Sequence, residues 1–85
     1  MGSGHTAEDY LSALAGLQAQ LGLPPTLREL ADELGMASAP AVLGRLRELR
    51  ECGYVERRTE DAYATRVWRV SKKGRRKLKR SELEK

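Results

Sequence analysis

The sequence has 85 residues, which is room for one domain, and a formal net charge of +4 at pH 7. A chain of this length buries about 60–65% of the surface that its unfolded form exposes, so its core must be compact. The single cysteine, Cys52, excludes an intramolecular disulfide and a multi-cysteine metal site. No apolar run approaches the ~18 residues of a membrane span. We therefore expect a cytoplasmic protein that uses no cofactor and no metal.

Charge is divided unevenly along the chain. Residues 1–53 carry four basic and seven acidic side chains, a balance of −3, whereas residues 54–85 carry twelve basic and five acidic ones, a balance of +7. Such asymmetry indicates an anionic partner for the C-terminal part. Nucleic acid is the commonest such partner, because each phosphate that a protein neutralises releases condensed counterions. A basic segment that only solvates the protein is the alternative.

The first predicted helix runs from Thr6 to Gln20, after a flexible leader at residues 1–5. Thr6 is the expected N-cap, and Gly22 ends the helix. Apolar residues recur at three- and four-residue steps and predict one buried stripe: Tyr10, Leu11, Leu14, Leu17 and Leu21.

A second, short helix is predicted from Thr26 to Leu34. Its opening, Thr26-Leu27-Arg28-Glu29, has the pattern of a capping box. Gly35 follows directly, at the position where a left-handed residue closes a helix.

A third helix is predicted from Ser38, its N-cap, to about Cys52, with Gly53 as its stop. Its inward stripe consists of Val42, Leu46 and Leu49, which lie within about 60° of one another at 100° per residue. Cys52 is expected to be structural, because a helix C-terminus disfavours the thiolate that a redox switch needs.

From residue 54 the pattern changes to a partial alternation of β-branched and aromatic residues. It predicts strands at 54–58 and 65–70, joined by a polar loop at 59–64. Trp68 is expected to pack in the core and not to stack on a base. Tyr63, in the loop, is a candidate contact to a sugar or a phosphate.

A basic segment closes the chain, and Ser71 can cap it as a last helix. This segment either binds phosphates or forms the solvent-exposed face of a dimerising helix that packs through Leu78. We divide the chain into the leader at 1–5, one domain at 6–78 and a basic tail at 79–85.

The order of these elements predicts an α+β, mainly α fold of the winged helix-turn-helix type. Three helices are followed by a two-stranded hairpin, the wing, and by a basic C-terminal helix or tail. In such modules the helix after the turn, here 38–52, enters the major groove, and the wing, here 54–70, contacts the flanking backbone.

The stretch Pro24 to Gly35, read as PPTLRELADELG, resembles the DNA-binding domains of the LexA repressor family, and the likeness continues at Ser38, Leu46, Leu49, Gly53 and Tyr54-Val55. The segment 68–75 resembles the strand-to-helix junction of MarR-like and DtxR-like regulators, and 8–11 resembles the first helix of DtxR-like ones. These resemblances imply a winged-helix transcriptional regulator.

Departures from those families limit what the resemblance carries over. LexA repressors also have a self-cleaving Ser/Lys protease domain, for which 85 residues leave no room. Pro40, Leu43 and Gly44 stand where that family has polar readers, whereas Ser38 matches a contact-making serine. The metal ligands of DtxR-like regulators have no counterpart, because the only histidine is His5.

The expected DNA-contacting residues come from the second helix, the third helix and the wing: Thr26, Arg28, Ser38, Ala41, Gly44, Arg45, Arg47, Arg58 and Arg66. Arg45 and Arg47 are candidates for guanine, because a guanidinium group can meet O6 and N7 together. Phosphate contact and plain solvation are the alternatives for both. Gly44 either admits a close approach of DNA or is an unoptimised surface position. Arg58 and Arg66 are expected near the loop end of the wing, with solvated strand positions as the alternative.

The sequence thus predicts a sequence-selective regulator of double-stranded DNA, in the first place a repressor. We expect a homodimer that reads two half-sites about one helical turn apart, without a small-molecule effector. One alternative is a winged helix that docks on a polymerase or another assembly, which the apolar Pro40, Ala41 and Leu43 would suit. Another is binding to structured RNA or to duplexes without sequence preference. An enzyme is not expected, because no nucleophile–base pair, carboxylate pair or phosphate loop can be assembled.

Overall fold

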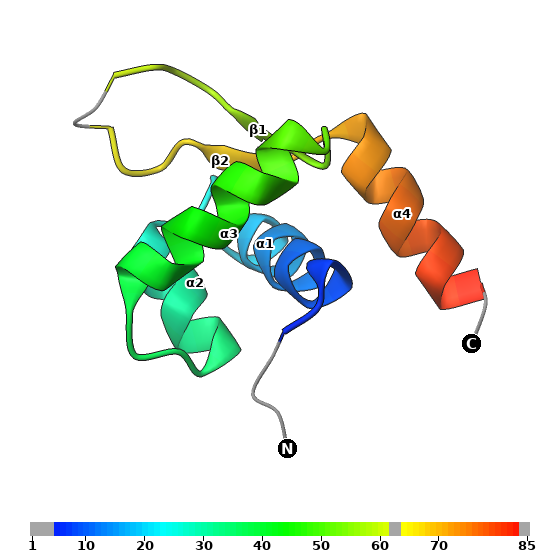
Figure 1. Ribbon diagram of the computed structural model, residues 1–85, viewed down its shortest axis with the longest axis horizontal. Helices are drawn as coiled ribbons and strands as arrows, with labels where there is room; N and C mark the ends of the chain where they lie inside the picture. The colour runs from blue at the N-terminus through cyan, green and yellow to red at the C-terminus, as the bar shows by residue number, and fades with distance from the viewer. Residues whose placement is uncertain (1–4, 62–63, 84–85) are drawn as a thin grey trace.

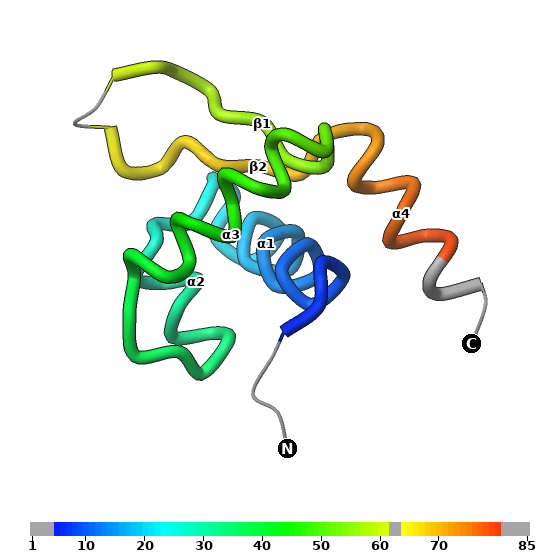
Figure 2. Tube along the Cα trace, viewed as in Figure 1, coloured from blue at the N-terminus to red at the C-terminus, as the bar shows by residue number. Residues whose placement is uncertain are grey.

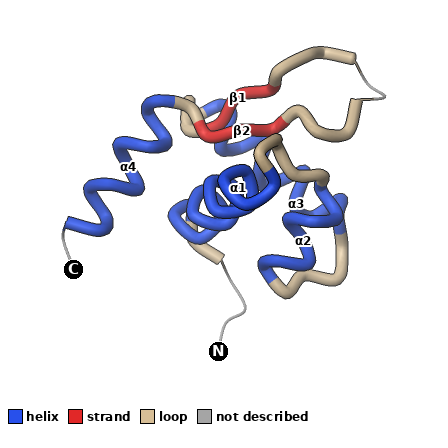
Figure 3. Tube along the Cα trace, turned by 180° about the vertical axis from the view of Figure 1, so that it is seen from behind, coloured by secondary structure: helices blue, strands red, loops and turns tan. Residues whose placement is uncertain are grey.

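The computed structural model describes residues 5–61 and 64–83, with side chains described as far as residue 80. Four helices and one hairpin follow in the order α1 (Ala7–Leu21), α2 (Leu27–Leu34), α3 (Ala39–Glu51), β1 (Val55–Arg57), β2 (Trp68–Val70) and α4 (Lys72–Leu83). In Figure 1, α3 crosses in front of α1, the hairpin lies above them, and α4 extends to the side away from the hairpin loop. Figure 3 shows the same layering from behind. The predicted mainly helical fold, with a hairpin after the third helix, is confirmed.

The helix ends are where the sequence places them. Thr6 and Thr26 both form complete capping boxes, in which the threonine hydroxyl accepts an N–H and a carboxylate three residues later accepts the threonine N–H. Gly22 and Gly35 end α1 and α2 in the left-handed conformation, with φ of 74° and 69°. Ser38 caps α3. The turn between α2 and α3 is therefore short and fixed at both ends.

One core joins all the elements. Side chains from the first three helices, from both strands and from position 67 are buried in it: Tyr10, Leu11, Leu14, Leu30, Ala31, Val42, Leu46, Leu49, Val55, Val67, Trp68 and Val70. The partly buried Leu78 of α4 packs against this core. The predicted inward stripe of α3 is confirmed, and Trp68 is a core residue. The predicted stripe of α1 is wrong at its end, because Leu21 is 41% exposed. It lies beside Gly22, where the chain turns away from the core.

The strands are shorter than predicted. The antiparallel register pairs Val55 with Val70 and Arg57 with Trp68, and one further hydrogen bond joins the Arg58 N–H to the Val67 carbonyl at 2.8 Å. Residues 64–66 leave this ladder. Figure 2 shows the resulting long loop between the two strands. Tyr63 lies outside the described residues.

The basic segment is a helix, and the boundary placed between residues 78 and 79 falls inside it. The Ser71 hydroxyl accepts the Gly74 N–H at 3.1 Å and donates to the Gly53 carbonyl, so Ser71 caps α4 as predicted. Gly74 packs directly on the chain at Tyr54, where a Cβ atom would lie 2.1 Å from the carbonyl oxygen. Across residues 5–61 and 64–83, no helix has the length and apolarity of a membrane span.

Candidate nucleic-acid interface

The N-terminus of α2 presents one predicted contact residue outward and uses the other internally. The Thr26 hydroxyl accepts the Glu29 N–H at 3.0 Å, and the Thr26 N–H donates to the Glu29 carboxylate at 2.8 Å. Thr26 is thus a capping residue first. Arg28 projects into solvent with its side chain 71% exposed, and its ion pair is a loose one, 3.4 Å from Asp32.

The outward face of α3 is small and apolar. Pro40, Ala41 and Gly44 are all exposed, and a Cβ atom built at Gly44 would meet nothing within 4 Å. The Ser38 hydroxyl is exposed and accepts the Ala41 N–H at 3.3 Å. A partner can therefore approach the backbone of α3 along its N-terminal half without meeting a large side chain.

The two candidate readers on α3 point in different directions. The Arg45 guanidinium donates to Glu48 at 2.7 Å and lies 5.8 Å from the centre of the Tyr10 ring, on the side that faces α1. Arg47 is exposed and makes no ion pair with any described side chain. Of the two, Arg47 is the cation that is free to bind a partner.

A groove of about 750 Å³ separates α3 from the wing. Thr26, Arg28 and Arg47 line it, so three of the predicted contact residues share one surface. Its apolar lining is Leu27, Leu43, Val67 and Trp68, and its further cations are Arg50 and Arg57. Sequence reasoning did not select these last two. Arg50 could have been found, because it stands one helical turn after Arg47.

Glu60 of the wing loop spans part of this groove. Its carboxylate accepts from Arg50 at 2.7 Å and from Arg57 at 3.4 Å. The hydrogen bond from Arg50 is the main cause that holds the pKa of Glu60 below its usual range. Two of the four groove arginines are thus neutralised by the protein itself.

Arg66 takes a position that the sequence did not predict. Its guanidinium makes a bidentate ion pair with Glu29, at 2.8 and 3.0 Å, and donates to the Pro24 carbonyl at 3.1 Å. The hydrogen bonds from Arg66 to the Glu29 carboxylate are the main cause that lowers the pKa of Glu29. Arg66 lies between the two strands, two residues before β2, but its side chain is directed to Glu29 and ties the wing to α2. Its contact with DNA stays a prediction.

Arg58 fits its expected place better. It follows β1 directly, where the strands separate, and is exposed. The described residues offer it no ion-pair partner, in contrast to the neighbouring Arg57, which is half-buried and lies 6.0 Å from the Trp68 ring centre. Of these two neighbouring arginines, Arg57 is thus engaged within the domain and Arg58 is exposed.

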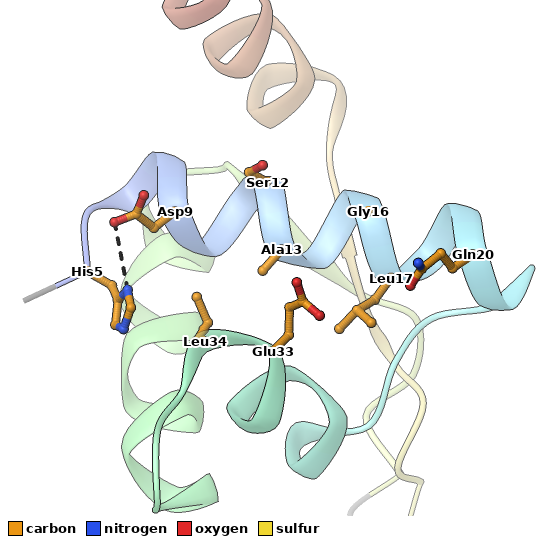
Figure 4. Close-up of a pocket in the computed structure, with 9 residues that line it drawn as sticks. All are labelled: His5, Asp9, Ser12, Ala13, Gly16, Leu17, Gln20, Glu33 and Leu34. Carbon is orange, nitrogen blue, oxygen red and sulfur yellow. Dashed lines mark ion pairs between the residues drawn. The ribbon is translucent and has the colours of Figure 1, made fainter.

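A second hollow, of about 440 Å³, lies between α1 and α2 (Figure 4). Its lining is mixed: Ala13, Leu17 and Leu34 are apolar, while Glu33 and the ion pair between His5 and Asp9, at 3.8 Å, are polar. This hollow has no cluster of cations and is a poor match for a phosphate backbone.

Comparison with known proteins agrees with this geometry. Residues 10–64, well over half of the chain, match the family model described as the LexA DNA binding domain. The chain belongs to the LexA DNA-binding domain family. The matched range runs from the end of the first turn of α1 to the wing loop, and so includes the whole helix-turn-helix.

One curated relative of this LexA-type domain is the LexA repressor of Pelotomaculum thermopropionicum (strain DSM 13744 / JCM 10971 / SI). It is 45% identical over 38 residues, which are 45% of this chain and 19% of the repressor. The match thus spans about a fifth of that relative's length. No solved structure matches the chain. The likeness of 68–75 to MarR-like and DtxR-like regulators lies beyond the matched range and stays a prediction.

Proposed function

We propose that this LexA-type domain is the DNA-reading part of a transcriptional repressor that selects particular duplex sequences. The observation that carries the proposal is the groove between α3 and the wing, in which the exposed Arg28 and Arg47 lie on one surface with Arg50 and Arg57, the two arginines that Glu60 pairs with. A helix about 10–12 Å across fits a major groove about 12 Å wide. The small outer face of α3, with Gly44 at its middle, would let that helix lie deep.

In the proposed complex, α3 enters the major groove and the wing follows the flanking backbone. Arg47 is the proposed base reader. Arg28 and Arg58 are proposed phosphate contacts from α2 and the wing, and Ser38 and Ala41 would lie nearest to the base edges at the start of α3. The hydroxyl of Thr26 would serve the complex indirectly, since it fixes the end of α2.

Arg45 and Arg66 have lesser roles in this proposal. Arg45 lies toward Tyr10 and would reach at most the edge of the footprint. Arg66 would position the wing through Glu29. Their substitution is expected to change affinity through the shape of the surface and not through a lost base contact.

The docking of another protein on α3 is the second candidate function, and its expected signature is an apolar patch. Leu43 is half-buried and faces the groove between α3 and the wing. Among the residues with described side chains, the exposed large hydrophobics are Leu21 and Leu23, which flank the end of α1 and not α3. The proposal of DNA as the partner of α3 is therefore preferred.

The testing experiment is a selection of bound duplexes from a random library, followed by binding measurements at several salt concentrations. If about six phosphates are contacted, log affinity falls against log salt with a slope of about −5. Enrichment of a two-fold symmetric sequence would support the proposed homodimer, with half-sites about one helical turn apart. A slope near zero, or a scrambled duplex that competes as well as the selected one, would contradict the proposal. The cytoplasmic location belongs to the same proposal, because its ligand is genomic DNA.

A further inference from the structure

The outer side of α4 carries five exposed cations: Lys72, Arg75, Arg76, Lys79 and Arg80. At 100° per residue they fall within an arc of about 140°, so they form one face, called here the α4 cationic face. None of the five makes an ion pair with a side chain that the structure describes. They repeat at spacings of three and four residues, at which like charges repel and weaken a helix. In the free protein, repulsion between these like charges therefore destabilises α4.

The other side of α4 is fully used to fix the helix on the domain. Lys73 donates to the Cys52 carbonyl at 2.8 Å, and both Lys73 and Lys77 lie 5.2 Å from the centre of the Tyr54 ring. Lys77 also pairs with Glu8 of α1 at 3.4 Å. Leu78 packs against the core. The orientation of α4 is therefore set. Leu78, through which the helix would pack in the alternative of a dimerising helix, already packs within the chain.

The position of α4 relative to α3 indicates which ligand its cationic face binds. The bond from Lys73 to Cys52, the C-cap of α3, places the first turn of α4 at the end of α3. Figure 1 shows the wing loop and α4 on opposite sides of the molecule. Resting on the function proposed above, we propose that the α4 cationic face binds the phosphate backbone of the same duplex, beyond the part covered by α3 and the wing.

The dimensions of the face suit that ligand. From Lys72 to Arg80 the helix rises about 12 Å, at 1.5 Å per residue. One DNA strand presents a phosphate about every 3.4 Å along the helix axis, so the face spans about three to four phosphates. Their negative charge would relieve the repulsion within the face. The contact is independent of base sequence, since it involves the backbone alone.

The test replaces all five cations by glutamine and compares the variant with a matched control. The control exchanges lysine for arginine and arginine for lysine at the same five positions and so keeps the charge. Both variants and the unchanged chain are measured against salt on the duplex selected from the library and on a version trimmed to the footprint of α3 and the wing. Thermal unfolding checks that the glutamine variant folds. Its melting temperature is expected to rise, because the repulsion between the five cations is gone.

On the long duplex the glutamine variant is expected to have a salt slope that is shallower by about 3, while the control keeps the slope of the unchanged chain. On the trimmed duplex the unchanged chain and the glutamine variant are expected to bind alike. An unchanged slope on the long duplex would overturn the α4 contact and leave the proposed function standing. So would binding of a second duplex per chain, since α4 would then serve another molecule. If the unchanged chain binds neither duplex, the proposed function itself fails.

Discussion

Gly44 is the position at which stability and DNA binding are expected to change in opposite directions. It lies in the middle of α3, is exposed, and has empty space where a Cβ atom would stand. Glycine in a helix interior costs about 0.8–1.0 kcal/mol relative to alanine. With no atom to displace, Gly44→Ala should recover this free energy. A domain of this size gains roughly 4–8 °C in melting temperature per kcal/mol.

The same methyl group would stand between α3 and a bound duplex. If the backbone of α3 approaches the base edges at Gly44, the substitution should weaken specific binding by about tenfold or more, which corresponds to roughly 1.4 kcal/mol. The measurement pairs thermal unfolding with titration of the selected duplex by fluorescence anisotropy.

Gly16→Ala is the matched control, because Gly16 is also an exposed glycine inside a helix with nothing within 4 Å of its Cβ position. It lies in α1, on the hollow beside α2 (Figure 4). This variant should gain a similar stability and bind DNA as before. If Gly44→Ala also binds as before, the close approach of DNA to α3 is refuted, and Gly44 is only an unoptimised surface residue.

Four further substitutions probe the rest of the domain. Gly74→Ala should lower the melting temperature in spite of alanine's helix propensity, because its Cβ would lie 2.1 Å from the Tyr54 carbonyl oxygen; a rise would contradict the packing of α4. Leu46→Ala should cost about 2–5 kcal/mol in chemical denaturation, since its side chain is fully buried. Glu60→Gln should tighten binding to any duplex and steepen its salt dependence, because it frees two groove arginines; weaker binding would mean that Glu60 mainly orders the wing. The pKa of Glu29 is lowered from 4.5, so the stability that its carboxylate contributes is present above that pH and is lost as the pH falls through the pKa of the folded state. In Glu29→Gln the melting temperature should therefore depend less on pH in this acid range.

The features that the sequence predicted well are those decided within a few residues. A capping box at Thr26, a left-handed Gly35 and the stripe of Val42, Leu46 and Leu49 each depend on neighbours in the chain. Side-chain hydrogen bonds to the nearest free N–H groups and a helical period of 3.6 residues require no knowledge of the rest of the fold. The helix-turn-helix was predictable for this reason.

The features that it missed are contacts between distant segments. Arg66 and Glu29 are 37 residues apart, and Arg50 and Glu60 belong to α3 and the wing loop. Alternation along a strand predicts on which face an arginine side chain lies, but it does not predict that an acidic side chain of a distant segment lies next to it. Strand length was overestimated for the same reason, because Arg66 bonds to Pro24 and to Glu29 of α2, and residues 64–66 leave the ladder.

The carboxylate of Glu29 takes part both in a local contact, the cap with Thr26, and in a long-range one, the ion pair with Arg66. Its Oε1 atom accepts the Thr26 N–H at 2.8 Å and the Arg66 Nη1 at 2.8 Å, so the group that closes the start of α2 also holds the wing. We expect a wing tied in this way to move with the helix-turn-helix as one body. Arg66→Ala removes only the tie, whereas Glu29→Ala also removes part of the cap. The difference between the two variants in thermal unfolding therefore sets the cap against the bond from Arg66 to the Pro24 carbonyl, which Glu29→Ala keeps. The loss of DNA affinity common to both measures how far a fixed wing helps α3 to bind.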